Sequence, residues 1–226
     1  MKIIYEGHAC FQLLGNDGPA ILLDPFISGN PACTKSPDAF NPDLILVSHG
    51  HGDHLGDALA IAGASGTTLA GPVELWRALD TEGLKTIGFN MGGSFEFKGA
   101  RISMAPAWHG SDVKGAYAGL ACGYVIRMEG RAVYFAGDTA LFGDMAAVLS
   151  RYDIDYALLP IGGFYTMGPQ DAVTAAQWLG AKTVIPMHYD TFPVIKQDVQ
   201  AFKKELEEQS GSRCLILAPG QEIEVF

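Results

Sequence analysis

Apolar residues near the start of the chain come in short runs separated by turn residues, which is typical of β-strands. Three runs predict a β-meander: Lys2–Glu6, His8–Leu14 and Ala20–Leu23. Residues 24–42 contain four prolines and are expected to form an irregular surface loop. The run Leu44–Val47 is apolar at every position, which indicates a strand covered on both faces, and it leads directly into Ser48 and His49.

The middle of the chain alternates between helical and strand patterns. The expected elements are a two-turn helix from Leu55, a strand at Thr67–Ala70 and a helix from Pro72 to about Leu79. Regular alternation on both sides of Gly99 and of Glu129-Gly130 then predicts two antiparallel hairpins. Their strands are Ser94–Lys98 with Arg101–Ala105, and Tyr117–Met128 with Arg131–Phe135.

The last third of the chain has the pattern of alternating helices and strands. Helices are expected at Leu141–Ser150, Pro169–Leu179 and Ile195–Glu208. Strands are expected at Tyr156–Pro160, Thr183–Pro186, Cys214–Leu217 and Glu222–Val225. Each half thus supplies a mostly antiparallel sheet followed by helices, and the economical arrangement packs sheet on sheet with helices outside. The expected fold class is α/β, a four-layer α/β/β/α sandwich in a single domain over residues 1–226.

Composition and charge restrict the partners of such a domain. The chain has 226 residues, of which 48% are hydrophobic and 18% charged, so it can build a core and is not disordered. Its formal net charge of −10 opposes binding to a polyanion, so nucleic acid is not expected as a partner. No apolar run approaches the roughly 18 residues of a membrane span, and the N-terminus lacks the apolar stretch of a signal peptide.

The cysteines indicate a compartment. They are far apart in the sequence and form no Cys-x-x-Cys pair, and their positions are Cys10, Cys33, Cys122 and Cys214. Reduced thiols beside apolar neighbours are typical of cytosolic proteins, and a zinc ribbon is excluded. The expected location is the cytoplasm without membrane contact, and the oligomeric state stays open, a homo-oligomer included.

The strongest chemical signal is the segment His49-Gly50-His51-Gly52-Asp53-His54. Gly50 and Gly52 are expected to allow unusual backbone angles, so that four ligands converge from six residues. Imidazole and carboxylate groups bind Zn²⁺, Mn²⁺ or Fe ions, and four of them in one loop exceed what one ion takes, which implies two ions. The alternative is a polar loop whose histidines only cap the following helix.

Three further candidate ligands follow apolar, strand-like stretches: His109, Asp138 and His188. Taken alone, each could be an ordinary surface-turn residue, and Asp138 could cap the helix near Leu141. Together they supply the ligands that the first loop lacks for two ions.

The order His-x-His-x-Asp-His, then His109, Gly137-Asp138-Thr139 and His188, resembles the metallo-β-lactamase superfamily over residues 49–188. A closer resemblance is to short metal-dependent hydrolases related to ascorbate-6-phosphate lactonase, and it covers nearly the whole chain. The segments that carry it are Gly7-His8-Ala9-Cys10-Phe11, Leu23-Asp24-Pro25-Phe26 and Leu141-Phe142-Gly143-Asp144-Met145.

The resemblance implies a role for each candidate residue. It assigns His49, His51 and His109 to one ion, Asp53, His54 and His188 to the other, and Asp138 to a bridge between them. Asp24 resembles the aspartate that steadies the histidine loop from behind. The implied activity is that of a dinuclear metal-dependent hydrolase whose nucleophile is a hydroxide between the ions. Zn²⁺ is the first candidate and Mn²⁺ and Fe²⁺ are alternatives, because all the ligands are nitrogen or oxygen.

Charge counting indicates the substrate class. Two divalent ions and a hydroxide, taken with Asp53 and Asp138, leave about one positive charge on the site. A small anionic ester, lactone or phosphoester is therefore expected. Lys35 and the loop Phe164–Gly168 stay open as pocket residues, with a solvated lysine and core packing as the alternatives. The alternative functions are a phosphodiesterase or nuclease of the same superfamily and a non-catalytic metal-binding protein.

His8 is the one histidine of the six without an implied metal role. One interpretation is a strand histidine that is hydrogen-bonded to backbone. The other interpretation makes His8 a catalytic residue, in addition to Asp53. Gly7 permits a bulge or close backbone approach just before His8, and the resemblance implies a Gly-His opening that lies beside the metals. A neutral imidazole next to a positive site can hydrogen-bond the substrate or shuttle the leaving-group proton.

Overall fold

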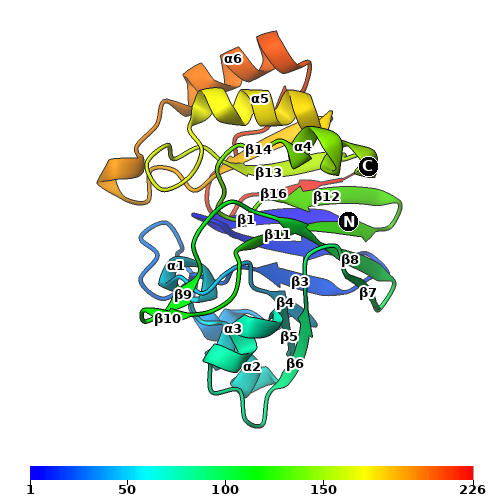
Figure 1. Cartoon of the computed structure of the whole chain (residues 1–226), viewed down its shortest axis with the longest axis vertical. Coiled ribbons are helices and arrows are strands. Elements are labelled where there is room, and N and C mark those ends of the chain that lie inside the picture. Colours follow the sequence, from blue (N-terminus) through cyan, green and yellow to red (C-terminus); the bar gives the residue numbers. More distant parts are fainter. Residues whose placement is uncertain (226) are drawn as a thin grey trace.

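Two β-sheets of seven strands each lie face to face, and helices cover the outer side of each sheet (Figure 1). The computed structural model describes residues 1–225. Helices α2 and α3 lie at one end of the molecule and helices α5 and α6 at the other, with both sheets between them. The expected four-layer α/β/β/α sandwich is therefore confirmed.

Chain order and strand order differ in both sheets. From one edge to the other, the first sheet holds β16 (Glu222–Glu224), β1 (Lys2–Gly7), β2 (Cys10–Leu14), β3 (Ala20–Leu23), β4 (Leu44–Leu46), β5 (Thr68–Pro72) and β6 (Lys85–Phe89). The second sheet holds β15 (Arg213–Cys214), β14 (Thr183–Met187), β13 (Tyr156–Pro160), β12 (Arg131–Phe135), β11 (Cys122–Met128), β8 (Ala100–Pro106) and β7 (Ser94–Phe97). A small separate ladder pairs β9 (Asp112–Val113) with β10 (Ala116–Tyr117).

The helices are short except for two in the second half. The α-helices are α1 (Gly52–Leu55), α2 (Ala58–Ser65), α3 (Val73–Ala78), α4 (Asp144–Ala147), α5 (Pro169–Leu179) and α6 (Val199–Ser210). The 3₁₀ turns are η1 (Pro37–Ala39), η2 (Leu149–Tyr152) and η3 (Pro193–Ile195). No helix among residues 1–225 combines the length and the apolar character needed to cross a bilayer.

Each sheet is antiparallel on one side and parallel on the other, so the expectation of mostly antiparallel sheets is wrong. Strands β3 to β6 run parallel in the first sheet, and β12 to β15 run parallel in the second. Parallel neighbours need crossover connections, and the helices and long loops between these strands provide them. The C-terminal β16 pairs with β1, so the first sheet is built from both ends of the chain.

The strand β6 has no counterpart among the predicted elements. Three of its five positions are exposed, so this edge strand buries too few side chains to produce a clear pattern. The strand expected at Tyr117–Met128 is divided in two, since β10 ends at Tyr117 and β11 begins at Cys122. The strand expected at Cys214–Leu217 is the two-residue β15.

Two predicted helices also differ from the structure. The helix expected at Leu141–Ser150 is a single turn, α4, followed by the 3₁₀ turn η2. The last helix begins at Val199 and not at Ile195, because the Asp198 carboxylate accepts hydrogen bonds from two backbone amides of the first turn.

The main hydrophobic core fills the space between the two sheets. Phe11 and Phe135 come from opposite sheets, are fully buried, and their ring centroids lie 6.5 Å apart. A second cluster packs Leu22 and Ile45, which point outward from the first sheet, against Ile61 of α2 and other residues of the helical layer. The first sheet is therefore apolar on both faces, as the continuous run around β4 predicts.

Hydrogen bonds from Tyr124 and Cys122 join the sheets where β4 ends, at the edge that carries the candidate ligands. The Tyr124 hydroxyl on β11 donates to the carbonyl oxygen of Val47 at 2.6 Å, and the Cys122 amide donates to the carbonyl oxygen of Ser48 at 3.1 Å. Tyr124 is fully buried. These bonds fix the backbone from which His49 begins.

We expect Tyr124→Phe to lower the free energy of unfolding by about 1 to 2 kcal/mol, because the Val47 carbonyl loses its buried donor. Urea titration followed by circular dichroism measures the change. Tyr117→Phe, at a side chain that is 69% exposed, is the control and should change stability little. Equal stability of wild type and Tyr124→Phe would show that the bond between the sheets contributes nothing.

Candidate metal centre

All the candidate site residues follow the ends of strands, and these strand ends meet at one edge of the sandwich. The first sheet contributes His8 after β1, Asp24 after β3 and His49–His54 after β4. The second sheet contributes His109 after β8, Asp138 after β12 and His188 after β14. Side chains that are far apart in the sequence are therefore brought together because strand carboxyl ends share an edge.

The glycines of the first loop act differently from the expectation. Neither Gly50 nor Gly52 has a positive φ, so the predicted unusual backbone angles are wrong. A Cβ at Gly50 would lie 2.6 Å from the carbonyl oxygen of Asp112, so glycine is needed there for a close backbone approach. Gly52 is the first residue of α1, which places Asp53 and His54 on one helical turn.

Three histidines form a first cluster. Nδ1 of His51 lies 3.0 Å from Nε2 of His49 and 3.3 Å from Nε2 of His109. The outer nitrogens have other partners, since His49 Nδ1 lies 2.9 Å from the Ser48 hydroxyl and His51 Nε2 lies 3.4 Å from the Asp112 carboxylate. One nitrogen of each ring is thus left facing a common point, as metal-binding imidazoles require.

A second cluster lies beside the first and contains His8, Asp53, His54 and His188, whose ligand atoms all lie within 4.8 Å of one another. Nε2 of His188 is 3.9 Å from the Asp53 carboxylate, and the His54 and His188 rings stack with centroids 5.5 Å apart. Three of the four side chains are buried, and Asp53 is partly exposed.

Asp138 lies between the two clusters. Its Oδ1 is 3.2 Å from Nε2 of His54, and its Oδ2 is 3.1 Å from Nε2 of His188. The same Oδ2 is 3.6 Å from Nε2 of His109 in the first cluster. The carboxylate is 3% exposed, so one buried anion faces histidines of both clusters.

The donor atoms fit a metal ion. In the part of the chain that the structure describes, Nε2 of His54, both ring nitrogens of His188 and Oδ1 of Asp138 are buried and have no hydrogen-bond partner. Buried polar atoms without partners are costly. Nε2 of His54 and Nε2 of His188 both lie within 3.2 Å of the Asp138 carboxylate, and such a convergence of donors is typical of a cation site. The imidazole and carboxylate donors suit Zn²⁺, Mn²⁺ or Fe²⁺.

Asp24 holds the ligand loop from behind. Its carboxylate accepts hydrogen bonds from the Ser48 amide at 2.7 Å and the Ser48 hydroxyl, and it lies 2.6 Å from Nδ1 of His54. The residue is fully buried and has a φ of +39°, in the left-handed region that residues other than glycine rarely adopt. With a metal ion held at Nε2 of His54, Nδ1 would keep its proton and donate a hydrogen bond to this carboxylate.

His8 is bound by two side chains, so neither ring nitrogen bonds backbone as the first interpretation expects. Nε2 lies 3.1 Å from the Asp53 carboxylate, and Nδ1 lies 2.9 Å from the Thr191 hydroxyl. Gly7, at a φ of +107°, lies at an irregularity between β1 and β2, which confirms the predicted bulge. Burial lowers the pKa of His8 to about 4 against the opposing effect of Asp53, so the ring is neutral at pH 7.

The surroundings shift the pKa values of the histidines in opposite directions, downward for His49 and His109 and upward for His54. Burial, reinforced for His49 by His54, lowers the pKa of His49 and of His109, which keeps these rings neutral and their lone pairs available. At His54, burial opposes the charged form, but Asp138 and Asp24 outweigh it and raise the pKa. At Asp138, burial is likewise outweighed by His54 and His188, which lower the pKa. The carboxylates therefore demand positive charge at the centre, which protons on histidine or a metal cation can supply.

Sequence reasoning missed Phe192, whose ring lies beside His8, and three further residues that contact candidate ligands or join their loops. Asp112 contacts the outer nitrogen of His51, and Thr191 contacts His8. The Thr139 hydroxyl accepts a hydrogen bond from the backbone amide of Trp108 at 2.9 Å, which ties the loop of His109 to that of Asp138. Only Thr139 carried a local signal, as the residue after Gly137-Asp138.

A cavity of about 400 Å³ opens over the two clusters. It is lined by His51, Asp53, His109, Asp138, Tyr165, His188 and Phe192. Of the open pocket candidates, Tyr165 of the Phe164–Gly168 loop lines this cavity. Lys35 instead forms an ion pair with the buried Glu6, with 2.6 Å between nitrogen and oxygen.

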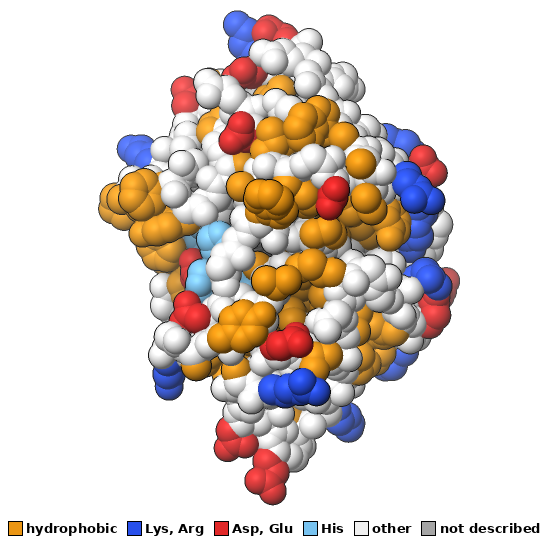
Figure 2. Space-filling view, viewed as in Figure 1, with side chains coloured by type: hydrophobic (Ala, Val, Ile, Leu, Met, Phe, Trp, Pro, Cys, Tyr) orange, Lys and Arg blue, Asp and Glu red, His pale blue; other side chains and the backbone are white. Residues whose placement is uncertain are grey.

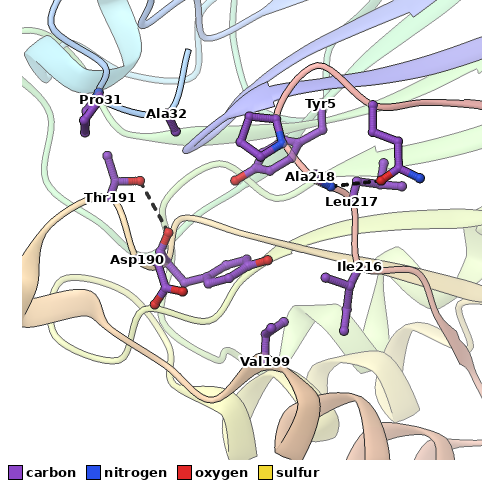
Figure 3. Close-up of a pocket in the computed structure, with 12 residues that line it drawn as sticks. Tyr5, Pro31, Ala32, Asp190, Thr191, Val199, Ile216, Leu217 and Ala218 are labelled. Carbon is purple, nitrogen blue, oxygen red and sulfur yellow. Dashed lines mark hydrogen bonds between the residues drawn. The ribbon is translucent and has the colours of Figure 1, made fainter. Parts of the chain in front are cut away.

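The segment between His188 and Phe192 lines a second cavity, of about 560 Å³. Figure 3 shows Thr191 and Asp190 on one of its walls, with Tyr5, Ile216 and Leu217 opposite. Thr191 therefore faces this cavity while its hydroxyl bonds His8, and the Tyr5 hydroxyl donates to the His8 carbonyl oxygen at 3.3 Å.

The fold and site define a class of protein. The family model described as the β-lactamase superfamily domain matches residues 20–189, and the chain belongs to that superfamily, the metallo-β-lactamases. Within it, the chain belongs to the UPF0173 family of metal-dependent hydrolases. It is 44% identical over 230 residues to the member from Pelotomaculum thermopropionicum, with 100% of each chain covered.

Two further relatives agree with this family. The UPF0173 metal-dependent hydrolase from Methanopyrus kandleri is 44% identical over 230 residues, with 99% of this chain and 100% of the relative covered. The solved structure of Igni18, a metallo hydrolase from the archaeon Ignicoccus hospitalis, is 35% identical with a TM-score of 0.90, and the match covers 98% of this chain and 97% of that chain. The protein is therefore a metal-dependent hydrolase of the metallo-β-lactamase superfamily.

We expect Asp24→Asn to weaken metal binding about 10- to 100-fold, because His54 and Ser48 lose the carboxylate that orients them. Competition against a chelator of known affinity, followed by elemental analysis, measures the change. Asp43→Asn is the matched control, since that carboxylate pairs with Lys98. An unchanged metal affinity in Asp24→Asn would contradict the supporting role of Asp24.

Proposed function

We propose that this protein is a dinuclear metal hydrolase that acts on a small anionic ester, lactone or phosphoester. The observation that carries the proposal is the position of Asp138, whose two oxygens face His54 and His188 on one side and His109 on the other. A single carboxylate placed between two histidine clusters suits two ions that share one ligand. The names of the relatives support metal-dependent hydrolysis in general terms.

The residues would hold the ions in two sets. His49, His51 and His109 would hold one, Asp53, His54 and His188 the other, and Asp138 both. Bound ions supply a water of lowered pKa and polarise the oxygen of the substrate bond. The chain itself would orient the ligands through Asp24, Ser48 and Asp112.

Asp53 is one of the two most exposed candidate ligands, with 29% of its side chain exposed against 33% for His51, and His8 would fix its orientation. A neutral His8 donates from Nε2 to Oδ2 of Asp53 and accepts from the Thr191 hydroxyl at Nδ1. His8 is fully buried and does not line the cavity, so direct contact with substrate is disfavoured. We therefore assign His8 a positioning role, and proton transfer remains the alternative that its variant tests.

The surroundings favour small substrates over nucleic acid. No Lys or Arg among residues 1–225 lines the cavity, and the chain has a net charge of −10, so a phosphate backbone would meet no basic groove. A cytoplasmic location is part of the proposal, supported by four free cysteines of which three are buried.

A substrate panel tests the function. Protein stripped with chelator and reloaded with Zn²⁺, Mn²⁺ or Fe²⁺ is assayed on esters, lactones, phosphodiesters and single-stranded RNA. We expect turnover of an ester, lactone or phosphoester only after reloading. Cleavage of RNA that survives 0.2 M salt would favour a nuclease, and an inert loaded protein would favour a non-catalytic metal-binding role.

We expect about two ions per chain in the wild type, and in Asp138→Asn a joint loss of ion occupancy and turnover, because the shared ligand serves both ions. Elemental analysis and the panel measure the two effects on the same samples. A metal-supplemented wild type with one ion at most, or full activity in Asp138→Asn, would refute the dinuclear proposal.

We expect His8→Ala to lower the affinity for one of the two ions about 10- to 100-fold while the fold is kept, because Asp53 loses its orienting donor. Stepwise chelator competition separates the two ions. Thr191→Val, which removes only the partner hydroxyl, should act in the same direction with a smaller effect. Two fully bound ions together with a loss of kcat of about 10²-fold would instead indicate proton transfer by His8.

A further inference from the structure

The cavity over the metal centre has a polar floor and an aromatic mouth. Five of its seven lining residues are candidate metal ligands: His51, Asp53, His109, Asp138 and His188. The remaining two, Tyr165 and Phe192, are aromatic. Whatever part of a substrate is not held at the metal centre therefore meets aromatic rings.

Tyr165 is presented by a loop whose base is fixed. The Gly163 amide donates to the Met167 carbonyl oxygen at 3.2 Å, and the Met167 amide donates to the Thr139 carbonyl oxygen at 2.9 Å, directly after Asp138. At the tip, Phe164 and Tyr165 are 65% and 54% exposed, and their rings meet edge to face with centroids 4.8 Å apart. Solvent-exposed aromatic side chains at the tip of a loop whose base is fixed by hydrogen bonds are typical of a recognition surface.

Phe192 comes from the loop after β14 and lies beside the second cluster, which contains His8. Its ring lies 5.4 Å from the His8 ring in an edge-on arrangement, and its carbonyl oxygen accepts the Ile195 amide at the start of η3. The neighbouring Val194 is 51% exposed. Figure 2 shows hydrophobic side chains gathered beside the histidines on this face of the molecule.

The charges near the mouth of the cavity limit the negative charge that a substrate can carry. Within residues 1–225 no lysine or arginine lines the cavity, and Lys35 is paired with Glu6. Asp112 beside His51 adds negative charge. Two divalent ions with Asp53, Asp138 and a hydroxide would leave about one positive charge, and the nearby Asp24 and Asp112 reduce it further, so a second negative charge on the substrate has no partner.

We propose that the substrate carries at most one negative charge and joins its reactive bond to an aromatic or extended apolar group, which Tyr165 and Phe192 receive. This inference rests on the proposed function, since it takes the metal centre as the place of reaction. Within the ester, lactone and phosphoester class, it disfavours phosphorylated sugars. Their second phosphate charge would meet no lysine or arginine, and the Tyr165 hydroxyl is the one polar side-chain group that the two aromatic lining residues offer to the sugar hydroxyl groups.

Binding of carboxylates, which resemble the acid product of ester hydrolysis, tests the inference without turnover. Calorimetric titration of Zn²⁺-loaded protein compares propanoate with 3-phenylpropanoate, which differ only by the phenyl group. We expect the phenyl compound to bind at least about tenfold tighter, because the ring leaves water for an aromatic site. Glucose 6-phosphate should bind no tighter than inorganic phosphate.

The deciding variant is Tyr165→Ala, because its exposed loop position leaves the core unchanged. We expect the preference for 3-phenylpropanoate to fall at least about threefold, with propanoate affinity and metal content unchanged. Phe192→Ala should act in the same direction, but it packs against His8, so metal content must be measured with it. Trp178→Ala removes an aromatic side chain from the far end of α5 and should keep the full preference.

Each possible result supports or overturns either the inference or the proposed function. Equal binding of the two carboxylates, tighter binding of glucose 6-phosphate, or an unchanged preference in Tyr165→Ala overturns the inference. A further outcome also overturns it. If sedimentation shows that the wild type is a dimer, and Tyr165→Ala dissociates the dimer without changing the preference for 3-phenylpropanoate, the rings form a contact between two copies of the chain and not a substrate site. Ester hydrolysis without the preference refutes the inference alone, whereas a preference without any hydrolysis in the panel refutes the proposed function alone.

Discussion

Two buried carboxylates on opposite sides of one histidine are the constraint on which the site depends. Nδ1 of His54 lies 2.6 Å from Asp24, Nε2 lies 3.2 Å from Asp138, and all three side chains are at most 3% exposed. Burying two anions costs several kcal/mol each unless positive charge accompanies them. The arrangement is therefore stable only with a cation or protons at its centre. In a metal-dependent hydrolase, the bound metal ion would provide this positive charge.

The sandwich makes this arrangement possible because ligand loops from both sheets meet at one edge. Asp24 and the His49–His54 loop belong to the first sheet, whereas Asp138 and His188 belong to the second. The bonds from Tyr124 and Cys122 to the backbone at the end of β4 keep the two sets in register. A small shift of one sheet against the other would separate the clusters, so core packing between the sheets also determines the ligand geometry.

Around this centre the cavity has two parts, a polar floor and an aromatic mouth, to which we assign reaction and substrate recognition in turn. The floor consists of ligands and the side chains that orient them, and it offers no lysine or arginine within the described residues that line it. The mouth consists of rings from loops after two neighbouring parallel strands, β13 and β14. The tip of the loop after β13, with Phe164 and Tyr165, can vary without disturbing the candidate ligands. The loop after β14 is more constrained, because it contains His188 and also Thr191, which contacts His8.

The sequence by itself determined the features that short-range patterns record, namely most of the strands and the candidate metal loop. The apolar runs predict most strands, and the spacing of His49, His51, Asp53 and His54 predicts a metal loop because these ligands lie within six residues. The parallel pairing, the edge strand β6 and the close approach of Gly50 to Asp112 were decided only in the tertiary structure. So were the orienting partners, since His8 and Thr191 are 183 residues apart. Contacts of this kind depend on how strands pair, and no local periodicity records that pairing.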